Sequence, residues 1–229
     1  MEREIVLDTE TTGLDPLSGH RVIEIGCIEL VNRIPTGKTF HSYINPERDV
    51  PAEAFAIHGI STEFLQDKPK FEEIADQFID FIQDSKLVIH NADFDMRFIN
   101  HHLFNIKKPD INKERVFCTL IYARKKFPGQ QNSLDALCRR FNIDNSRRLK
   151  HGALLDADIL AEVYVELMGG KQNTIALEQK EKVKVEEKTE TIVVDFAPRK
   201  FKVSDEELKK HNEFLEKFPN SLWNKIENK

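Results

Sequence analysis

The chain has 229 residues, a formal net charge of −5, 32% charged and 40% hydrophobic residues. This length and composition predict a globular protein with one sizeable core and an appendage. The absence of an apolar run of 18 residues excludes a membrane-spanning helix. The acidic balance argues against a tight, sequence-reading DNA protein, but not against an enzyme that meets phosphate through metal ions. Three scattered cysteines and a start without the features of a signal peptide predict a cytoplasmic protein.

The first informative stretch is residues 5–13, Ile-Val-Leu-Asp-Thr-Glu-Thr-Thr-Gly. Its three leading apolar residues predict a short buried strand, which a turn at residues 11–13 ends. Side chains two apart on a strand point to the same face, so Asp8 and Glu10 should project into one small volume. Carboxylates that close repel each other unless a cation such as Mg²⁺ lies between them. By itself, this pair fits two solvated acids at a strand end equally well.

The following segments predict an α/β sheet with antiparallel and parallel parts. A long strand at residues 21–32 should pair with a second strand at 38–44 through a turn at 35–37. Hydrophobic periodicity then alternates between helices and strands. The expected order is short helices at 51–64, a helix at 71–84, a strand at 86–90, a helix at 91–106, a strand at 115–119, helices at 120–126 and 133–141, and a last core helix at 151–168.

Two of the predicted helices each carry a pair of acids, of which one lies on the packed face. Asp95 shares the apolar stripe of its helix, whereas Asp93 falls on a polar stripe. In the last core helix, Asp156 lies on or near the packed face and Asp158 on the solvent face. An acid on an apolar face is costly without a partner. Asp95 and Asp156 are therefore the candidate site residues.

Four acids from separate elements, Asp8, Glu10, Asp95 and Asp156, would destabilise the fold without cations. With two divalent ions they become ligands of a site that hydrolyses a phosphodiester. His151 directly precedes the last core helix, and imidazole is suited to take a proton from the attacking water near neutral pH. The sequence has no Walker-type glycine loop and no Ser or Cys in the context of a nucleophile.

Two other features stay open on the residues alone. His58 lies among the short helices, where a single histidine is more often a surface or structural residue than a site residue. A basic group fits a solvated surface and a guide for a phosphate backbone equally well. Its members are Arg139, Arg140, Arg147, Arg148 and Lys150.

Taken together, Asp8-x-Glu10, Asn-Ala-Asp-Phe-Asp at 91–95 and His151-x4-Asp156 resemble the three motifs of the DEDDh 3′–5′ exonucleases. The order, the spacing and the type of histidine all match. The resemblance covers residues 5 to about 170. It implies an RNase H-like fold, in which helices flank a mixed five-stranded sheet, followed by a flexible C-terminal tail. Within the family, the Asp-Thr-Glu-Thr-Thr-Gly stretch is similar to the proofreading enzymes that accompany bacterial replicative DNA polymerases.

The resemblance also implies roles for the site residues. Two divalent ions, Mg²⁺ or Mn²⁺, would be held by four carboxylates: Asp8, Glu10, Asp95 and Asp156. All of these except Asp95 would also contact the scissile phosphate. His151 would be the general base, and Glu53 and His58 would contact the 3′-terminal nucleotide of a single-stranded or frayed DNA end. This last role replaces the structural interpretation of His58.

The C-terminal part divides into two segments after an exonuclease domain at residues 1–170. Residues 171–190 alternate Lys and Glu and predict a charged linker. In the related proofreading enzymes a clamp-binding peptide follows the domain, and residues 172–177 resemble it, with Leu177 in place of Phe. Residues 191–229 hold a capping box at Ser204 and Glu207, and Trp223. This segment resembles the tether to the polymerase alpha subunit; binding of a small accessory subunit is left open.

The expected function is proofreading by removal of mismatched 3′-terminal nucleotides as nucleoside 5′-monophosphates, within a replisome at the bacterial nucleoid. The alternative is a stand-alone enzyme of the same family that trims DNA or RNA 3′ ends. A non-catalytic scaffold is disfavoured, because all four acids and His151 are present.

Overall fold

The computed structural model describes residues 2–148, 150–170 and 202–217. The chain divides into two compact units, Met1–Ala176 and Leu177–Lys229. Within the described residues, no helix has the length and apolar character needed to cross a membrane.

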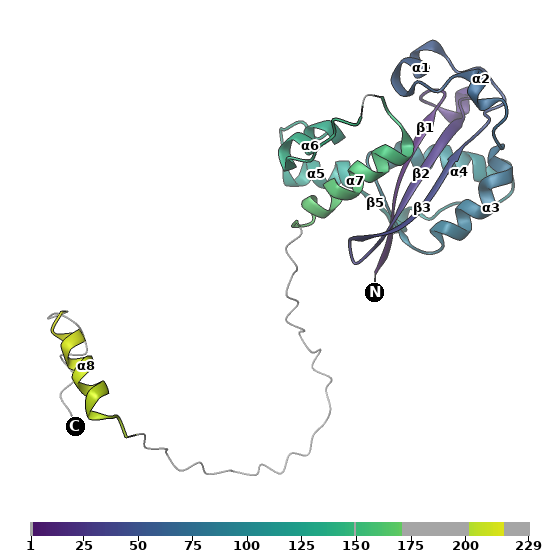
Figure 1. Cartoon of the computed structure of the whole chain (residues 1–229). Helices are drawn as coiled ribbons and strands as arrows, with labels where there is room; N and C mark the ends of the chain where they lie inside the picture. Colours follow the sequence, from purple (N-terminus) through teal and green to yellow (C-terminus); the bar gives the residue numbers. More distant parts are fainter. Residues whose placement is uncertain (1, 149, 171–201, 218–229) are drawn as a thin grey trace, which may run out of the picture. The chain divides into compact units, whose positions relative to one another are not determined.

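The first unit is built on one five-stranded sheet with the order β3-β2-β1-β4-β5 (Figure 1). β1, β2 and β3 pair antiparallel, whereas β4 and β5 run parallel to β1. The strands are β1 Arg3–Thr11, β2 Val22–Val31, β3 Ile34–Tyr43, β4 Lys86–Ile89 and β5 Val116–Cys118. The expected mixed sheet is confirmed.

Helices flank this sheet, as expected of an RNase H-like fold (Figure 1). The α-helices of this unit are α1 Ala52–His58, α2 Thr62–Leu65, α3 Phe71–Ile82, α4 Ala92–Asn105, α5 Thr119–Lys126, α6 Leu134–Phe141 and α7 Ala153–Leu167. Short 3-10 turns precede β2 and β5, at Pro16–Ser18 and Lys113–Arg115.

The sheet has a hydrophobic core on each face, and the alternation of side chains along β1 assigns residues to them. Ile5 and Leu7 pack with apolar residues of α3 and α4. Val6 points the other way and packs with α5, α6 and α7. Asp8 and Glu10 share the parity of Val6, so the strand directs both carboxylates toward the face that α7 covers.

β1 is longer than the three apolar residues at 5–7 predict. It continues to Thr11, because β2 pairs with it along its whole length, with Glu10 opposite Glu24. The turn expected at 11–13 therefore begins only after Thr11, which is still paired with Val22 of β2. Asp8 and Glu10 both lie within the paired part of the strand.

The predicted hairpin turn at residues 35–37 is wrong. β2 and β3 are joined at Asn32 and Arg33, which both have positive φ angles, 52° and 66°. A two-residue loop with positive φ at both positions is typical of the type I′ turn, whose twist matches that of the flanking strands, whereas a type I or II turn would splay them. Gly37, with a φ of 84°, falls within β3 at a register shift between the two strands. It marks a bulge in an edge strand.

The described part of the second unit contains α8, Asp205–Leu215. The predicted capping box is present, because the Ser204 side chain accepts a hydrogen bond from the Glu207 N–H and the Glu207 side chain accepts one from the Ser204 N–H. Residues 172–177 and Trp223 lie outside the described residues, so the peptide and the end of the tail stay predictions.

The close approach of α7 to β2 generates the first prediction. A Cβ added at Gly26 would lie 2.3 Å from the backbone nitrogen of Leu154, so Gly26→Ala forces α7 away from the sheet. We expect a loss of about 1–3 kcal/mol in the free energy of unfolding, measured by urea denaturation. Gly152→Ala is the matched control, because its Cβ has no neighbour nearer than 4.0 Å and its φ of −161° suits any residue. The control should change the stability by less than about 0.5 kcal/mol. Equal stability of both variants would contradict the packing argument.

Candidate active site

The candidate site lies where β1 ends and where α4 and α7 begin. Asp8 and Glu10 come from the last half of β1. Asp95 and Asp156 each lie in the first turn of their helix, α4 and α7, where the helix dipole favours a negative charge. Asn91, in the left-handed conformation with a φ of 65°, turns the chain from β4 into α4. Asn is one of the few residues that adopt this conformation readily.

Burial separates the site acids from their neighbours as expected. Asp95 and Asp156 are 3% and 2% exposed. Asp93 is exposed, and the Asp158 side chain is 47% exposed. The predicted difference in burial between the two acids of each helix is therefore confirmed.

Asp95 is bound to the end of β1 by a hydrogen bond. The Thr9 hydroxyl donates to Asp95 Oδ1 over 2.7 Å. Thr9 has the parity of Ile5 and Leu7, so this contact lies on the face of β1 that α4 covers. The charges that act on Asp8 include those of Asp95, Glu10 and Asp156, with Arg148 opposing them, so Asp8 lies within reach of the acids on both sides.

Asp156 carries the strongest polar contacts of the site. Arg148 donates to it through both arms of its guanidinium, with Nε 2.6 Å from Oδ1 and Nη2 2.7 Å from Oδ2. A third nitrogen, Nη1, lies 2.8 Å from Asp135 Oδ1 in the first turn of α6. His151 Nδ1 lies 2.9 Å from Arg148 Nη2 and 3.3 Å from Asp156 Oδ2.

Glu10, His151 and Asp156 form a group suited to a metal ion. Each offers one ligand atom, and these atoms lie within 4.8 Å of one another. Carboxylate oxygens are the donors that hard divalent cations take. With Asp8 and Asp95 beside this group, the donor set fits divalent ions.

The pKa values of the acids show how much negative charge is gathered here. Burial, followed by the charges of Asp95, Glu10 and Asp156, holds the pKa of Asp8 well above its usual range. Burial and nearby acids, Asp156 first, raise the pKa of Glu10 to about 8. Burial raises the pKa of Asp95 to about 7 against the effect of the Thr9 hydrogen bond.

Asp156 behaves in the opposite way. Burial acts to raise its pKa, but the contacts with His151 and Arg148 outweigh it and lower the pKa. Asp156 is thus the acid whose charge the protein compensates most. Arg148 also acts to lower the pKa values of Asp8 and Glu10, and the Thr9 hydrogen bond that of Asp95, but the pKa values of these three acids stay raised. A cation at these three would relieve their repulsion.

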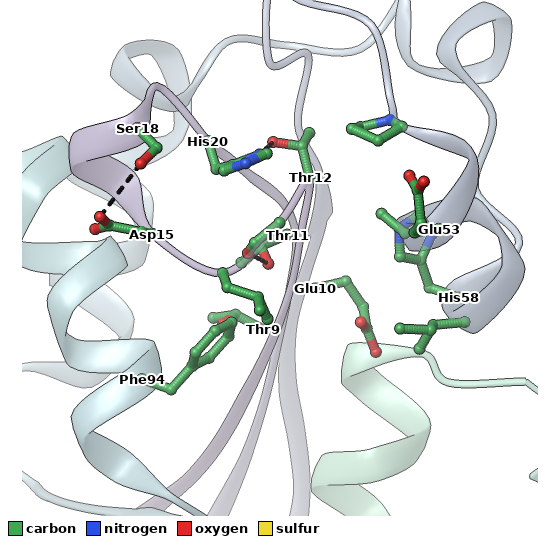
Figure 2. A pocket seen from close by; sticks show the side chains of 15 residues that line it. Thr9, Glu10, Thr11, Thr12, Asp15, Ser18, His20, Glu53, His58 and Phe94 are labelled. Carbon is green, nitrogen blue, oxygen red and sulfur yellow. Dashed lines mark hydrogen bonds between the residues drawn. The ribbon is translucent and has the colours of Figure 1, made fainter.

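A pocket of about 560 Å³ opens beside Glu10 (Figure 2). Glu53 and His58 of α1 line one wall, and Phe94 and His20 lie across from them. His58 Nδ1 accepts the Ile60 N–H over 3.0 Å, which places the ring proton on Nε2. His58 is buried, yet Nε2 has no hydrogen-bond partner among the described residues. Burial first, opposed by Glu24, lowers the pKa of His58, which favours the neutral ring with its proton on Nε2.

Two residues that line this pocket, His20 and Phe94, were not among the predicted site residues. The ring of His20 packs on Gly13, where a Cβ would lie 2.3 Å from the ring, and its Nδ1 lies 3.2 Å from the Thr12 hydroxyl. The one sequence signal that could have identified Phe94 as a pocket residue is its position directly before Asp95 in the second motif.

Both interpretations of the basic group are wrong for one of its members, Arg148. Arg148 is neither a solvated residue nor a free guide for phosphate, because it is paired with Asp156 and Asp135 and only 9% exposed. Arg140 binds Asn132 and Gln130 of the loop before α6. Arg147 is exposed and reaches Asp158 over 3.3 Å.

Comparisons with known proteins agree with this geometry. The family model described as exonuclease, RNase_T, matches residues 5–164. DNA polymerase III subunit epsilon of Rickettsia conorii is 56% identical over 223 residues, an alignment that covers 93% of this chain and 95% of that protein. A structure of exonuclease X in complex with 5′-overhanging duplex DNA matches with a TM-score of 0.57 and 27% identity, and covers 72% of this chain and 90% of that one.

The nuclease domain of 3′hExo, a DEDDh family member bound to rAMP, matches with a TM-score of 0.62 over 73% of this chain and 92% of that one; at 18% identity it supports the fold alone. Fold and carboxylate site together define an exonuclease domain of the DEDDh type. The chain belongs to the exonuclease family and, within it, to the epsilon subunits of DNA polymerase III. The expected fold and family are confirmed.

The raised pKa values predict how the stability of the metal-free protein depends on pH. Glu10 and Asp95 hold protons more tightly in the folded chain, with pKa values of about 8 and 7 against ordinary values of 4.5 and 3.8. Their stabilising effect is complete below the ordinary pKa values and is lost as the pH rises through the folded ones. Thermal melting in EDTA should therefore show a melting temperature that falls from pH 5 to pH 8.

The matched variants for this measurement are Asp95→Asn and Asp93→Asn. Asp95→Asn removes a buried acid and should flatten the dependence, whereas Asp93→Asn removes an exposed acid of the same helix and should leave it unchanged. A saturating divalent cation should flatten it too. A melting temperature that rises between pH 5 and 8 in EDTA would contradict the proposed crowding of acids.

Proposed function

We propose that this chain is the proofreading 3′–5′ exonuclease of a bacterial replicative DNA polymerase III and removes mismatched 3′-terminal nucleotides. The observation that carries the proposal is the grouping of Glu10, His151 and Asp156 within 4.8 Å, beside Asp8 and Asp95, in a chain of the epsilon family. The DEDDh-type fold implies divalent metal ions. The products are nucleoside 5′-monophosphates.

In this proposal each site residue has a role that follows from its position in the site. Asp8, Glu10, Asp95 and Asp156 hold two divalent ions, Mg²⁺ or Mn²⁺, and Asp8, Glu10 and Asp156 also flank the scissile phosphate. When bound, such ions activate a water and stabilise the leaving oxygen of a phosphodiester. The carboxylates of β1 are rigidly placed by the sheet, and those of α4 and α7 by the packed first turns of these helices.

His151 takes the proton of the attacking water. It lies outside α7, and its side chain is 45% exposed, so it can reach a solvent molecule at the site. Its backbone N–H bonds the carbonyl of Ile57 over 3.3 Å, which ties it to α1. The nitrogen that accepts the proton must be unprotonated, and a hydrogen bond from Nδ1 to Asp156 leaves Nε2 in that state.

The pocket beside Glu10 holds the 3′-terminal nucleotide. Its volume of about 560 Å³ falls in the range of sites that bind small ligands. The buried Nε2–H of His58 supplies a donor that lacks a protein partner, and Glu53 supplies an acceptor at the rim. A single-stranded or frayed end enters such a pocket more easily than a paired one, because an unpaired base need not be pulled out of a duplex.

The proposal also covers partners and location, for which membership of the epsilon family is the support. α8 is short, and Leu208 within it and Val203 just before it are both more than half accessible, so this apolar surface suits a partner better than a core of its own. Residues 191–229 tether the chain to the alpha subunit, and residues 172–177 bind the sliding clamp. A tether raises the local concentration of the nuclease at the primer end without high intrinsic affinity for DNA. In this proposal the complex works at the nucleoid, and the binding of a small accessory subunit stays open.

The metal ligands are tested by removing one acid of β1. Asp8→Ala should abolish release of nucleotides from a primer–template 3′ end in Mg²⁺, a loss of at least about 10³-fold, while the protein stays folded. Asp158→Asn removes an exposed acid of α7 and is the control that should retain the rate. Retention of nuclease activity by Asp8→Ala would refute the assignment of the site.

The polymerase tether is tested with two versions of the chain, the full one and one that ends at Gly170. Both should degrade the 3′ end in Mg²⁺, because the site lies in the first compact unit. Only the full chain should co-purify with the polymerase alpha subunit. If the full chain degrades DNA but never binds the polymerase, the protein is a stand-alone exonuclease, and RNA 3′ ends become the substrate to test.

A further inference from the structure

Arg148 is hydrogen-bonded to Asp156, one of the proposed metal ligands. Its guanidinium uses both oxygens of Asp156, at 2.6 and 2.7 Å, in a two-pronged contact that is among the strongest between ionised side chains. The same Asp156 belongs to the group within 4.8 Å that suits a divalent ion. A cation that binds Asp156 must therefore share this carboxylate with Arg148 or displace one of its two bonds.

The surroundings of Arg148 keep it at the site when it gives up such a bond. Nη1 is held by Asp135 of α6 at 2.8 Å, and Asp135 in turn accepts a hydrogen bond from the Asn145 side chain at 3.0 Å. The backbone N–H of Arg148 bonds the carbonyl of Asn145. Arg148 thus has a second anchor that is independent of Asp156.

Arg148 also determines which nitrogen of His151 is free. A guanidinium only donates, so the contact of 2.9 Å with His151 Nδ1 requires a lone pair on Nδ1 and puts the proton of the neutral ring on Nε2. In that state neither nitrogen can accept a proton from water. The alternative contact of Nδ1 is Asp156 Oδ2 at 3.3 Å, which needs the proton on Nδ1 and leaves Nε2 free.

We propose that Arg148 is a positioning residue that holds Asp156 and His151 in an idle arrangement in the metal-free enzyme and competes with the incoming divalent cation for Asp156. Binding of the cation removes Arg148 from at least one oxygen of Asp156 and from His151 Nδ1. The site then gains its ligand and its base in the same step. This inference rests on the proposed metal site.

The first test measures the binding of Mn²⁺ alone to the full chain, from the electron paramagnetic resonance signal of the free ion. Arg148→Gln should bind Mn²⁺ at least about tenfold more tightly than the wild type, because Asp156 is no longer held in a state that cannot bind. Arg147→Gln removes an equal charge from the next position, where the side chain is 60% exposed, and should match the wild type. Equal or weaker binding by Arg148→Gln, in a wild type that does bind Mn²⁺, would overturn the inference alone.

A wild type that binds no Mn²⁺ would overturn the metal site itself, and the inference with it.

The second test uses the wild type and does not depend on the folding of a variant. ¹⁵N NMR of the His151 ring at about pH 8, where free imidazole is neutral, reports the tautomer. The proton should lie on Nε2 without metal and on Nδ1 with saturating Mg²⁺. The same tautomer in both conditions would overturn the role of Arg148 toward His151.

Discussion

The repulsion between carboxylates at the end of β1 is the constraint on which the site depends. The pairing of β1 with β2 and β4 places Asp8 and Glu10 near the C-terminal end of this central strand. The first turns of α4 and α7 add Asp95 and Asp156. Such a cluster opposes folding, so the stability must come from the two apolar cores on the faces of the sheet. The fold is in this sense a rigid frame that keeps like charges together until a cation relieves them.

The protein compensates the charge of one site acid much more than that of the others, and this difference bears on how the site would bind a cation. Arg148 compensates Asp156, whereas the pKa values of Asp8, Glu10 and Asp95 stay raised. An arginine fork fixes the direction of a carboxylate as well as its charge, which a diffusible ion does not do before it binds. The metal-free site is therefore ordered at Asp156 and electrostatically strained at the remaining acids, an arrangement that favours uptake of divalent ions at the strained side.

The pocket beside Glu10 and the residue His151 are linked through the segment before α7. His151 bonds its backbone N–H to Ile57 of α1, and the ammonium group of Lys150 lies 5.0 Å from the centre of the Phe55 ring. His58, on the same helix, lines the pocket, and its buried Nε2 has no hydrogen-bond partner among the described residues. A ligand in this pocket would therefore contact the helix to which His151 is bonded. In the proposed function, this proximity would couple the fit of the 3′-terminal nucleotide to the position of His151.

The local sequence determined the elements and the candidate acids. Strand parity placed Asp8 and Glu10 on one side, and helical periodicity separated the buried Asp95 from the exposed Asp93, because both depend only on the repeat of the backbone. The tertiary structure alone decided the rest. The hairpin turn lies at Asn32 and Arg33, since pairing along the strands outweighed the Pro-Thr-Gly signal. Arg148 meets Asp156 only because the loop after α6 folds back onto α7, a contact that no periodicity encodes.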